Sequence, residues 1–469
     1  MKSSGDCQNR NYALTRVGLT TLAFALIAAS CATKLEDAPT SGEVLTEALP
    51  DTEIAMEWSA PAGDTGSVDD GWLKSFNDQQ LEEVVSEALR MQNPNMRILA
   101  AQVDRAEAAA RLAGAALEPT IGLAAGISEN LGGSGSGATN SGGSVAMSWE
   151  ADVWGRVQAG ANAAEENLRA TVADFEFARQ SLAANVAKSW YLAIELQGQE
   201  DLAREVVDIR IELLDVVETR AELGAVSTQD VFLARSDLSA AENVVRQTVA
   251  GQREARRALE VLIGRYPGAQ IEIAPELVPV PPPISTGLPS ELLERRPDLI
   301  AADRRVAREF FLTEEARLAS LPRFSLTLGA GLGDTISSLS AGLVGPLYTG
   351  GAIEAQLDGA TASQQAAIAA YGAAALNAFE EVETALNNES LMAEREGFLQ
   401  NIVSNEYQAY GIERIHYEEG ATDILSVLQI QSRWIAARIA LLRLQNQRLA
   451  QRINLHLALG GSFEVAPAN

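Results

Sequence analysis

Residues 144–156 read Ser-Val-Ala-Met-Ser-Trp-Glu-Ala-Asp-Val-Trp-Gly-Arg, and they join two different periodicities. Up to Val153, apolar side chains alternate with polar or small ones, which predicts an extended strand. After Gly155 the chain has no proline until Pro267, and it is rich in Ala, Leu, Glu, Gln and Arg, so a long helix is favoured. A helix over 155–222 would be roughly 100 Å long at about 1.5 Å per residue, which does not fit a compact globule.

The same order of segments occurs twice along the chain. Two prolines 25 residues apart and two glycines 40 residues apart recur in each half; the pairs are Pro94/Pro119, Pro297/Pro322, Gly224/Gly264 and Gly420/Gly460. The equivalent prolines of the two halves are 203 positions apart, whereas the equivalent glycines are 196 positions apart. The seven extra residues of the first half lie in a Gly/Ser-rich stretch, 131–143, which predicts an exposed loop tip.

Four alternating segments flank this loop and its counterpart in the second half. They predict two hairpins, at 120–153 and 323–348, with strands of the length that crosses a bilayer, roughly 9–11 residues. Two hairpins on a soluble core are the alternative. Because about eight strands are needed to close a filled barrel, membrane strands would have to be pooled from several copies of the chain.

The N-terminus predicts a bacterial lipoprotein signal peptide, residues 1–30. A positively charged start and a 13-residue apolar stretch, Val17–Ala29, end in small residues directly before Cys31. Small residues followed by cysteine resemble a lipobox, in which the cysteine thiol is diacylated. The residue after Cys31 is Ala32 rather than Asp, which by the usual sorting pattern of lipoproteins points to the outer membrane. Ordinary cleavage beside an incidental cysteine is the alternative, and palmitate labelling of a Cys31→Ser variant tests it.

Composition argues against several functions. The net charge of −27, without a basic stripe, argues against nucleic-acid binding. The two cysteines, Cys7 and Cys31, and the two histidines, His416 and His456, have no metal-ligand spacing, so we expect no metal, no cofactor and no catalytic residue. On a long charged helix, the pair Glu380-Glu381 predicts a solvated face rather than acid–base chemistry. We expect His456 to be packed, and His416 to lie near a helix end.

Several motifs carry a resemblance to a known family. Residues 149–156, Trp-Glu-Ala-Asp-Val-Trp-Gly-Arg, resemble the W-E-x-D-x-[WF]-G-R signature of the outer-membrane factor family (TolC/OprM-like, with NodT-type efflux lipoproteins). Residues 72–81, 288–299 and 345–351 are similar to its repeat openings and to its fourth-strand exit. The resemblance implies a mainly α fold with a membrane β-barrel. Long coiled-coil helices would form a periplasmic tunnel, and four strands per protomer would contribute to a trimeric 12-stranded barrel.

Together, pattern and resemblance predict a layout with two internal repeats. An extended N-terminal segment covers 31–70, and a Pro-rich linker, 267–290, joins the repeats. The first repeat, 71–266, has the hairpin 120–153, a long helix 155–222 and a return helix 227–263. The second repeat, 291–463, has a helix 297–321, the hairpin 323–348, a long helix 351–418 and a return helix 423–459.

The resemblance implies an outer-membrane exit duct of a tripartite efflux system, passive and not enzymatic, conducting drugs or other small molecules. The implied partners are two further copies in a homotrimer, a periplasmic membrane-fusion adaptor, an inner-membrane pump with the RND type as first choice, and outer-membrane lipid. Two alternatives remain: a channel for type I protein secretion, and a non-conducting coiled-coil scaffold lipoprotein.

Two groups of residues are implied in function at the ends of the long helices. The turns are expected to dock onto the adaptor; their residues are Gly224, Ala225, Ser227, Gly420, Ala421 and Asp423. We expect the two glycines to end the long helices in a left-handed cap, and Ser227 and Asp423 to be the N-caps of the return helices. In TolC-like members of the family, aspartates six and nine residues after the second tip glycine form a ring around the periplasmic aperture of the tunnel. Counted from Gly420, these positions are Ser426 and Gln429 here. We therefore expect a neutral aperture in which Leu425 and Gln429, one turn apart, face the axis.

Overall fold

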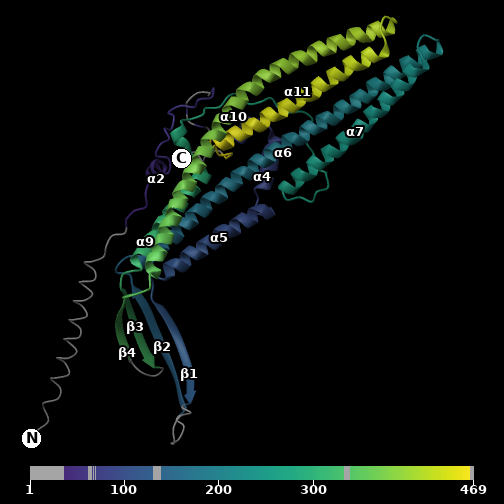
Figure 1. The fold of residues 1–469 in the computed structure, drawn as a ribbon. Coiled ribbons are helices and arrows are strands. Elements are labelled where there is room, and N and C mark those ends of the chain that lie inside the picture. Colours follow the sequence, from purple (N-terminus) through teal and green to yellow (C-terminus); the bar gives the residue numbers. More distant parts are fainter. Residues whose placement is uncertain are drawn as a thin grey trace, which may run out of the picture. The chain divides into compact units, whose positions relative to one another are not determined.

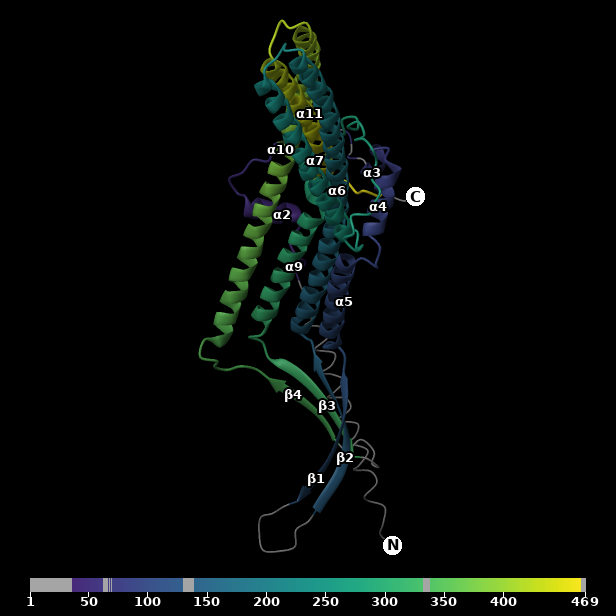
Figure 2. The same ribbon diagram turned by 90° about the vertical axis from the view of Figure 1, so that its right-hand side faces the viewer.

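The computed structural model describes residues 36–61, 66, 68, 70–129, 139–331 and 338–464 (Figures 1 and 2). The predicted signal peptide and Cys31 lie outside these residues. The chain forms two compact units: the first comprises residues up to Asp51, 102–172 and 301–373, and the second comprises the remainder. Each unit takes segments from both predicted repeats, so the compact units do not follow the repeat boundaries.

Equivalent helices in the two halves of the chain have the same length. Helices α5 (Pro94–Ala115) and α9 (Pro297–Leu318) have 22 residues each. The long helices α6 (Arg156–Glu222) and α10 (Ala352–Glu418) have 67 residues each, and the return helices α7 (Thr228–Leu262) and α11 (Ile424–Ala458) have 35 each. This equality is what an internal repeat predicts. In the described part of the chain, no helix combines the length and the apolar composition that a membrane span needs.

The first unit contains one antiparallel sheet in the order β1-β2-β3-β4 (Figure 2). Its strands are β1 (Thr120–Glu129), β2 (Thr139–Ala151), β3 (Arg323–Gly331) and β4 (Ser338–Val344). The pairing of β2 with β3, which runs from Ser144↔Gly331 to Ala151↔Phe324, joins the two halves of the chain. Strands β1 and β4 form the two edges, and neither has a second strand partner among the described residues.

Several elements end earlier than the sequence patterns predict. Strand β2 stops at Ala151 because the chain turns there, with the Val153 N–H donating to the Ala151 carbonyl at 2.9 Å. Strand β4 stops at Val344, not Tyr348, because the next residues are glycine and proline, and proline has no N–H to continue the ladder. Helix α9 ends at Leu318 rather than Leu321, since a residue before a proline is disfavoured in helical geometry.

The segment 31–70 is not extended throughout, which corrects the sequence-based expectation. It contains the eight-residue helix α2 (Ser41–Ala48). Thr40 and Glu43 form a capping box: the Glu43 carboxylate accepts from the Thr40 N–H at 2.8 Å, and the Thr40 hydroxyl accepts from the Glu43 N–H at 3.4 Å. The Thr-x-x-Glu spacing that signals such a cap was present in the sequence.

The main core of the second unit surrounds Trp190 and Tyr191 in the middle of α6. Both are fully buried and pack with Leu81 of α4 (Gln79–Ala88) and Ile453 of α11. The Trp190 indole N–H donates to the Asp78 carboxylate at 2.9 Å, so burying this large ring leaves no unsatisfied donor.

Two buried charged side chains fix the Pro-rich linker to this core. The Glu260 carboxylate accepts from the backbone N–H groups of Ala269, Gln270 and Ile271 at 2.7, 2.6 and 2.9 Å. Arg452 donates to the carbonyls of Pro281 and Pro282 and pairs with Glu389. The linker forms neither helix nor strand at these residues, so the two side chains satisfy its backbone groups.

We expect Glu260→Gln to lower the stability of the folded protein by about 2 kcal/mol, because a neutral amide replaces a charge-assisted acceptor of several N–H bonds. Burial raises the pKa of Glu260, but the backbone N–H groups outweigh it and hold the pKa below its ordinary value of 4.5. Its stabilising contribution is therefore complete above the ordinary pKa and is lost as pH falls through the lowered value.

The apparent Tm of the purified protein, measured from pH 7 down to pH 3, checks this expectation. Glu254→Gln, an exposed position on the same helix, is the matched control. Equal Tm values for both variants at pH 7 would contradict the role given to Glu260.

Candidate functional site: the helical hairpin tips

The turns that join the long and return helices share one backbone geometry. Gly224 and Gly420 have φ angles of 70° and 79°, the left-handed conformation that glycine adopts without strain. The Ala225 N–H donates to the Arg220 carbonyl at 2.8 Å, and the Ala421 N–H donates to the His416 carbonyl at 2.8 Å. Each long helix thus ends in a Schellman motif closed by backbone atoms alone.

The return helices begin with side-chain caps, as the sequence predicts. The Asp230 carboxylate accepts from the Ser227 N–H at 2.9 Å and the Ser227 hydroxyl accepts from the Asp230 N–H at 3.3 Å, which forms a capping box. Asp423 accepts from the Ser426 N–H at 2.9 Å, and this bond holds the pKa of Asp423 below its ordinary value. Because backbone and caps define both turns, Ala225 and Ala421 leave their side chains free at the exposed surface.

The two helical hairpins, α6–α7 and α10–α11, pack against each other beneath the tips (Figure 1). A small apolar core contains Val217 of α6, Ala234 of α7 and Val427 of α11. Arg220 joins the hairpins directly, because its guanidinium donates to the Tyr417 carbonyl and lies 4.6 Å from the centre of the Tyr417 ring.

The expected aperture residues at the start of α11 differ in exposure from their neighbour Leu428. Leu425 is 51% exposed and Gln429, one turn further on, is also exposed, whereas Leu428 is 9% exposed and belongs to the tip core. Ser426 is half-buried and takes part in the Asp423 cap. Leu425 and Gln429 are therefore available for contacts outside the protomer, while Leu428 is not.

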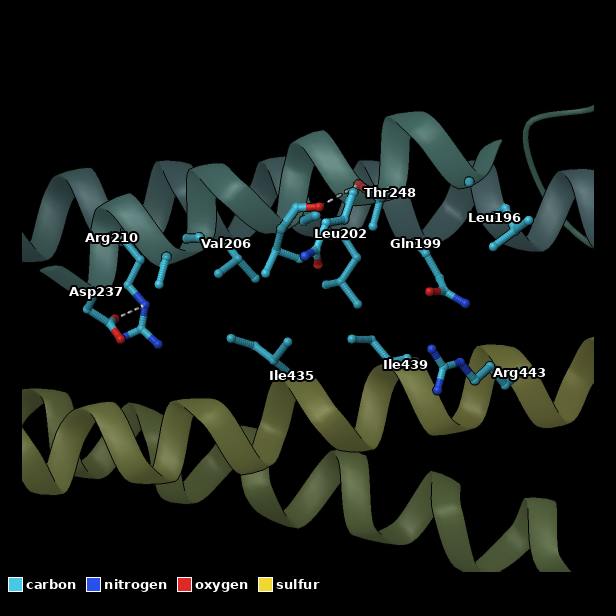
Figure 3. Close-up of a pocket in the computed structure, with 16 residues that line it drawn as sticks. Leu196, Gln199, Leu202, Val206, Arg210, Asp237, Thr248, Ile435, Ile439 and Arg443 are labelled. Carbon is cyan, nitrogen blue, oxygen red and sulfur yellow. Dashed lines mark hydrogen bonds and ion pairs between the residues drawn. The ribbon is translucent and has the colours of Figure 1, made fainter. Parts of the chain in front are cut away.

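A second feature lies further along the same helices and was not anticipated from the sequence. A cavity of about 510 Å³ opens between α6, α7 and α11, with apolar walls and polar groups at both ends (Figure 3). Arg210 and Asp237 form an ion pair of 2.7 Å at one end. The signal was available: Arg210 precedes the core residue Val217 by seven residues, so a charge occupies a position of the helix that faces the core.

The remaining sequence-based candidates have structural contacts. Glu381 pairs with Arg296 at 2.6 Å. His456 is buried and stacks on Trp72 at 5.6 Å, and burial together with Arg452 lowers its pKa to about 3. His416 lies in the last turn of α10, 3.9 Å from Glu413. Among the described residues, no group of three or more His, Cys, Asp or Glu is placed to hold a metal ion.

The two tryptophans of the signature segment have structural partners as well. The Trp149 indole N–H donates to the Leu117 carbonyl at 2.9 Å, and the Trp154 indole N–H donates to the Pro322 carbonyl at 2.8 Å. Both bonds satisfy carbonyl groups at the points where a helix gives way to a strand.

Comparison with known proteins relates the chain to outer-membrane channels. The family model described as "Outer membrane efflux protein" matches residues 85–265 and 288–461. The pyoverdine export outer membrane protein OpmQ of Pseudomonas aeruginosa is 29% identical over 416 residues, which cover 84% of this chain and 87% of OpmQ. The cation efflux system protein CusC of Escherichia coli is 28% identical over 410 residues, covering 84% of this chain and 88% of CusC.

Solved structures with a similar fold include two such channels. The outer-membrane channel OprN matches with a TM-score of 0.79 at 24% identity, over 92% of this chain and 98% of OprN. CusC matches with a TM-score of 0.76 at 25% identity, over 88% of this chain and 99% of CusC. The long helices and the four-stranded sheet thus recur together in solved outer-membrane channels.

Proposed function

The chain belongs to the outer membrane efflux protein family, and we propose from this premise that it is the exit duct of a tripartite efflux system. The family places it in the outer membrane, with its helices in the periplasm, and its relatives are channels and not enzymes. In the proposal, three copies assemble and conduct small molecules passively, while an inner-membrane pump supplies the energy.

The observation that carries this proposal is the four-stranded sheet. Its edge strands, β1 and β4, have open backbone groups, which proteins normally pair or protect. Both edges also expose large apolar side chains; they include Ile121, Leu123, Leu339, Leu343 and Val344. Open edges favour pairing with the sheets of other copies, and exposed apolar side chains favour contact with lipid. Three copies would pool twelve strands, in agreement with the homotrimer expected from the sequence.

The hairpin tips fit a periplasmic adaptor as the next partner. Their backbone is fixed by the glycine turns and caps, while small side chains at Ala225 and Ala421 allow another helix to approach closely. We propose a membrane-fusion adaptor docked on both tips and a pump of the RND type behind it. Cys31 would add a lipid anchor; it lies outside the described residues and stays a prediction.

The names of the relatives favour efflux of small molecules over type I protein secretion. OpmQ is named for pyoverdine, CusC for cations and TtgF of Pseudomonas putida for toluene. These cargoes differ widely in charge and polarity, which supports a duct whose selectivity comes from the pump. A non-conducting scaffold would have no use for a sheet that exposes apolar side chains on two open edges.

Conductance of the purified protein in planar bilayers tests the proposal. We expect a mass corresponding to three copies and discrete single-channel steps, since a channel closed at rest still opens intermittently. Leu123→Asp places a charge on the exposed apolar side of β1 and should abolish insertion. A trimer that inserts into the bilayer yet never conducts would favour the scaffold alternative.

A further inference from the structure

The cavity between α6, α7 and α11 has the form of an elongated slot (Figure 3). On α6 its lining extends from Leu196 to Arg210, which corresponds to roughly 21 Å at about 1.5 Å per residue. Its volume of about 510 Å³ lies within the range of small-molecule sites, about 300–1,000 Å³. A helix of that length and about 10 Å in diameter would occupy roughly 1,600 Å³, so an extended chain fits better than a helix.

The walls of the slot are apolar along its middle. Figure 3 shows Ile435 and Ile439 of α11 directed toward Val206 and Leu202 of α6, and Val244 of α7 also lines the cavity. These side chains provide a dry surface for a hydrocarbon chain, which gains free energy in proportion to the apolar area removed from water.

The end of the slot near the tips is polar but balanced in charge. The Arg210 side chain is 6% exposed, and its Nε lies 2.7 Å from the Asp237 carboxylate. Its Nη1 atom is buried and has no hydrogen-bond partner. A buried N–H group without a partner is costly, so this atom requires an acceptor. Because Asp237 already neutralises the guanidinium, a neutral oxygen such as a hydroxyl suits this position better than a second carboxylate.

The opposite end of the slot carries an uncompensated positive charge. Arg443 of α11 lines the cavity, is exposed, and forms no ion pair with any residue that the structure describes. The Gln199 side chain of α6 lies at the same end (Figure 3), and its amide donates to the buried Glu195 carboxylate one turn away. In a chain with a net charge of −27, a guanidinium without an ion-pair partner at the mouth of an apolar slot is suited to an anionic group.

We propose that this cavity is a binding site for an elongated amphiphile with an anionic group at one end and a hydrogen-bond acceptor at the other, such as an ω-hydroxy fatty acid. Its carboxylate accepts from Arg443, its hydrocarbon chain packs between Val206, Leu202 and the two isoleucines of α11, and its terminal oxygen accepts from Arg210 Nη1. The site lies between helices α6, α7 and α11.

Photolabelling of the full trimer in lipid nanodiscs tests this site. The probe is a diazirine analogue of dodecanoate, and mass spectrometry locates the labelled peptides. We expect saturable labelling within 196–210 and 435–443. 12-Hydroxydodecanoate should compete about tenfold more strongly than dodecanoate, because it satisfies a buried N–H group. Dodecanol, which lacks the anion, should not compete.

Variants separate this site from background labelling by membrane lipid. Arg443→Gln should lower the labelling of these two segments about tenfold. Arg246→Gln, an exposed position on α7 outside the cavity, should leave it unchanged. Ile439→Trp should block labelling by filling the slot, and size-exclusion chromatography verifies that each variant remains trimeric.

Two results would overturn the proposal. One is labelling of these segments that does not saturate, or that persists in both Arg443→Gln and Ile439→Trp. The other is loss of adaptor binding in Ile439→Trp with unchanged labelling, which would assign the cavity to a protein partner. Either result with normal single-channel conductance would reject the binding site and leave the exit-duct proposal standing.

Discussion

Efflux is expected to be lost when arginine replaces Ala225 or Ala421, while the yield of folded trimer stays normal. Both side chains are exposed, and both turns are closed by backbone hydrogen bonds and by the caps at Ser227 and Asp423. A larger side chain therefore leaves the turn intact. It would, however, prevent the close approach that packing against an adaptor's helical tip requires, since tightly packed interfaces tolerate overfilling poorly.

Drug susceptibility of cells that depend on this channel measures the effect. We expect each tip variant to be as susceptible as a strain lacking the channel, a loss of nearly all activity. Ala250→Arg introduces the same side chain at an exposed position of α7 away from the tips and is the matched control. Full resistance in both tip variants, with normal amounts of trimer, would show that the adaptor does not dock there.

The second large effect is expected at the aperture, where Leu425→Ser should raise single-channel conductance severalfold. Leu425 is 51% exposed in the protomer and shares one face of α11 with Gln429, so we propose that these residues meet their counterparts from other copies at the axis. An apolar constriction can close a pore by excluding water, and a hydroxyl in place of leucine would wet it. The same change should increase the sensitivity of cells to vancomycin.

Leu428→Ser is the matched control, because it is the same substitution three residues further along α11, at a buried position. Leu428 is 9% exposed and packs in the tip core, so we expect a loss of about 3 kcal/mol in stability and little change in conductance. Unchanged conductance and unchanged vancomycin sensitivity in a well-folded Leu425→Ser trimer would exclude Leu425 from the gate. Acidic side chains near the turn, at Glu418, Glu419 and Asp423, would still supply its electrostatics.

The sequence alone predicted the elements whose cause is local. A glycine in the left-handed conformation ends each long helix at Gly224 and Gly420, and a capping side chain begins each return helix at Ser227 and Asp423. Strand alternation and the absence of prolines predicted where sheet and helix occur. Such features depend on a residue and its neighbours within one helical turn, so they can be recognised in a linear sequence. The capping box at Thr40 follows the same rule.

Burial along the long helices could not be predicted equally well. Leu168 and Phe175 of α6 lie seven residues apart, the spacing of core positions in a coiled coil, yet both are only half-buried, and the fully buried positions nearby are Ala163 and Ala170. Small side chains allow helices to approach closely, and which face of a helix does so depends on its rotation about its own axis. A linear pattern leaves that rotation open when alanine, leucine and phenylalanine occur on several faces.

Contacts between distant segments were decided by the tertiary structure alone. The pairing of β2 with β3, the Arg220–Tyr417 contact between hairpins, and the Arg210–Asp237 pair in the cavity wall each join elements that different parts of the chain supply. Charged residues are common along all these helices, and no spacing within one helix identifies a partner on another. The sequence determined the hairpins and their turns, whereas packing in three dimensions decided which of their charges are buried, paired or left free for a ligand.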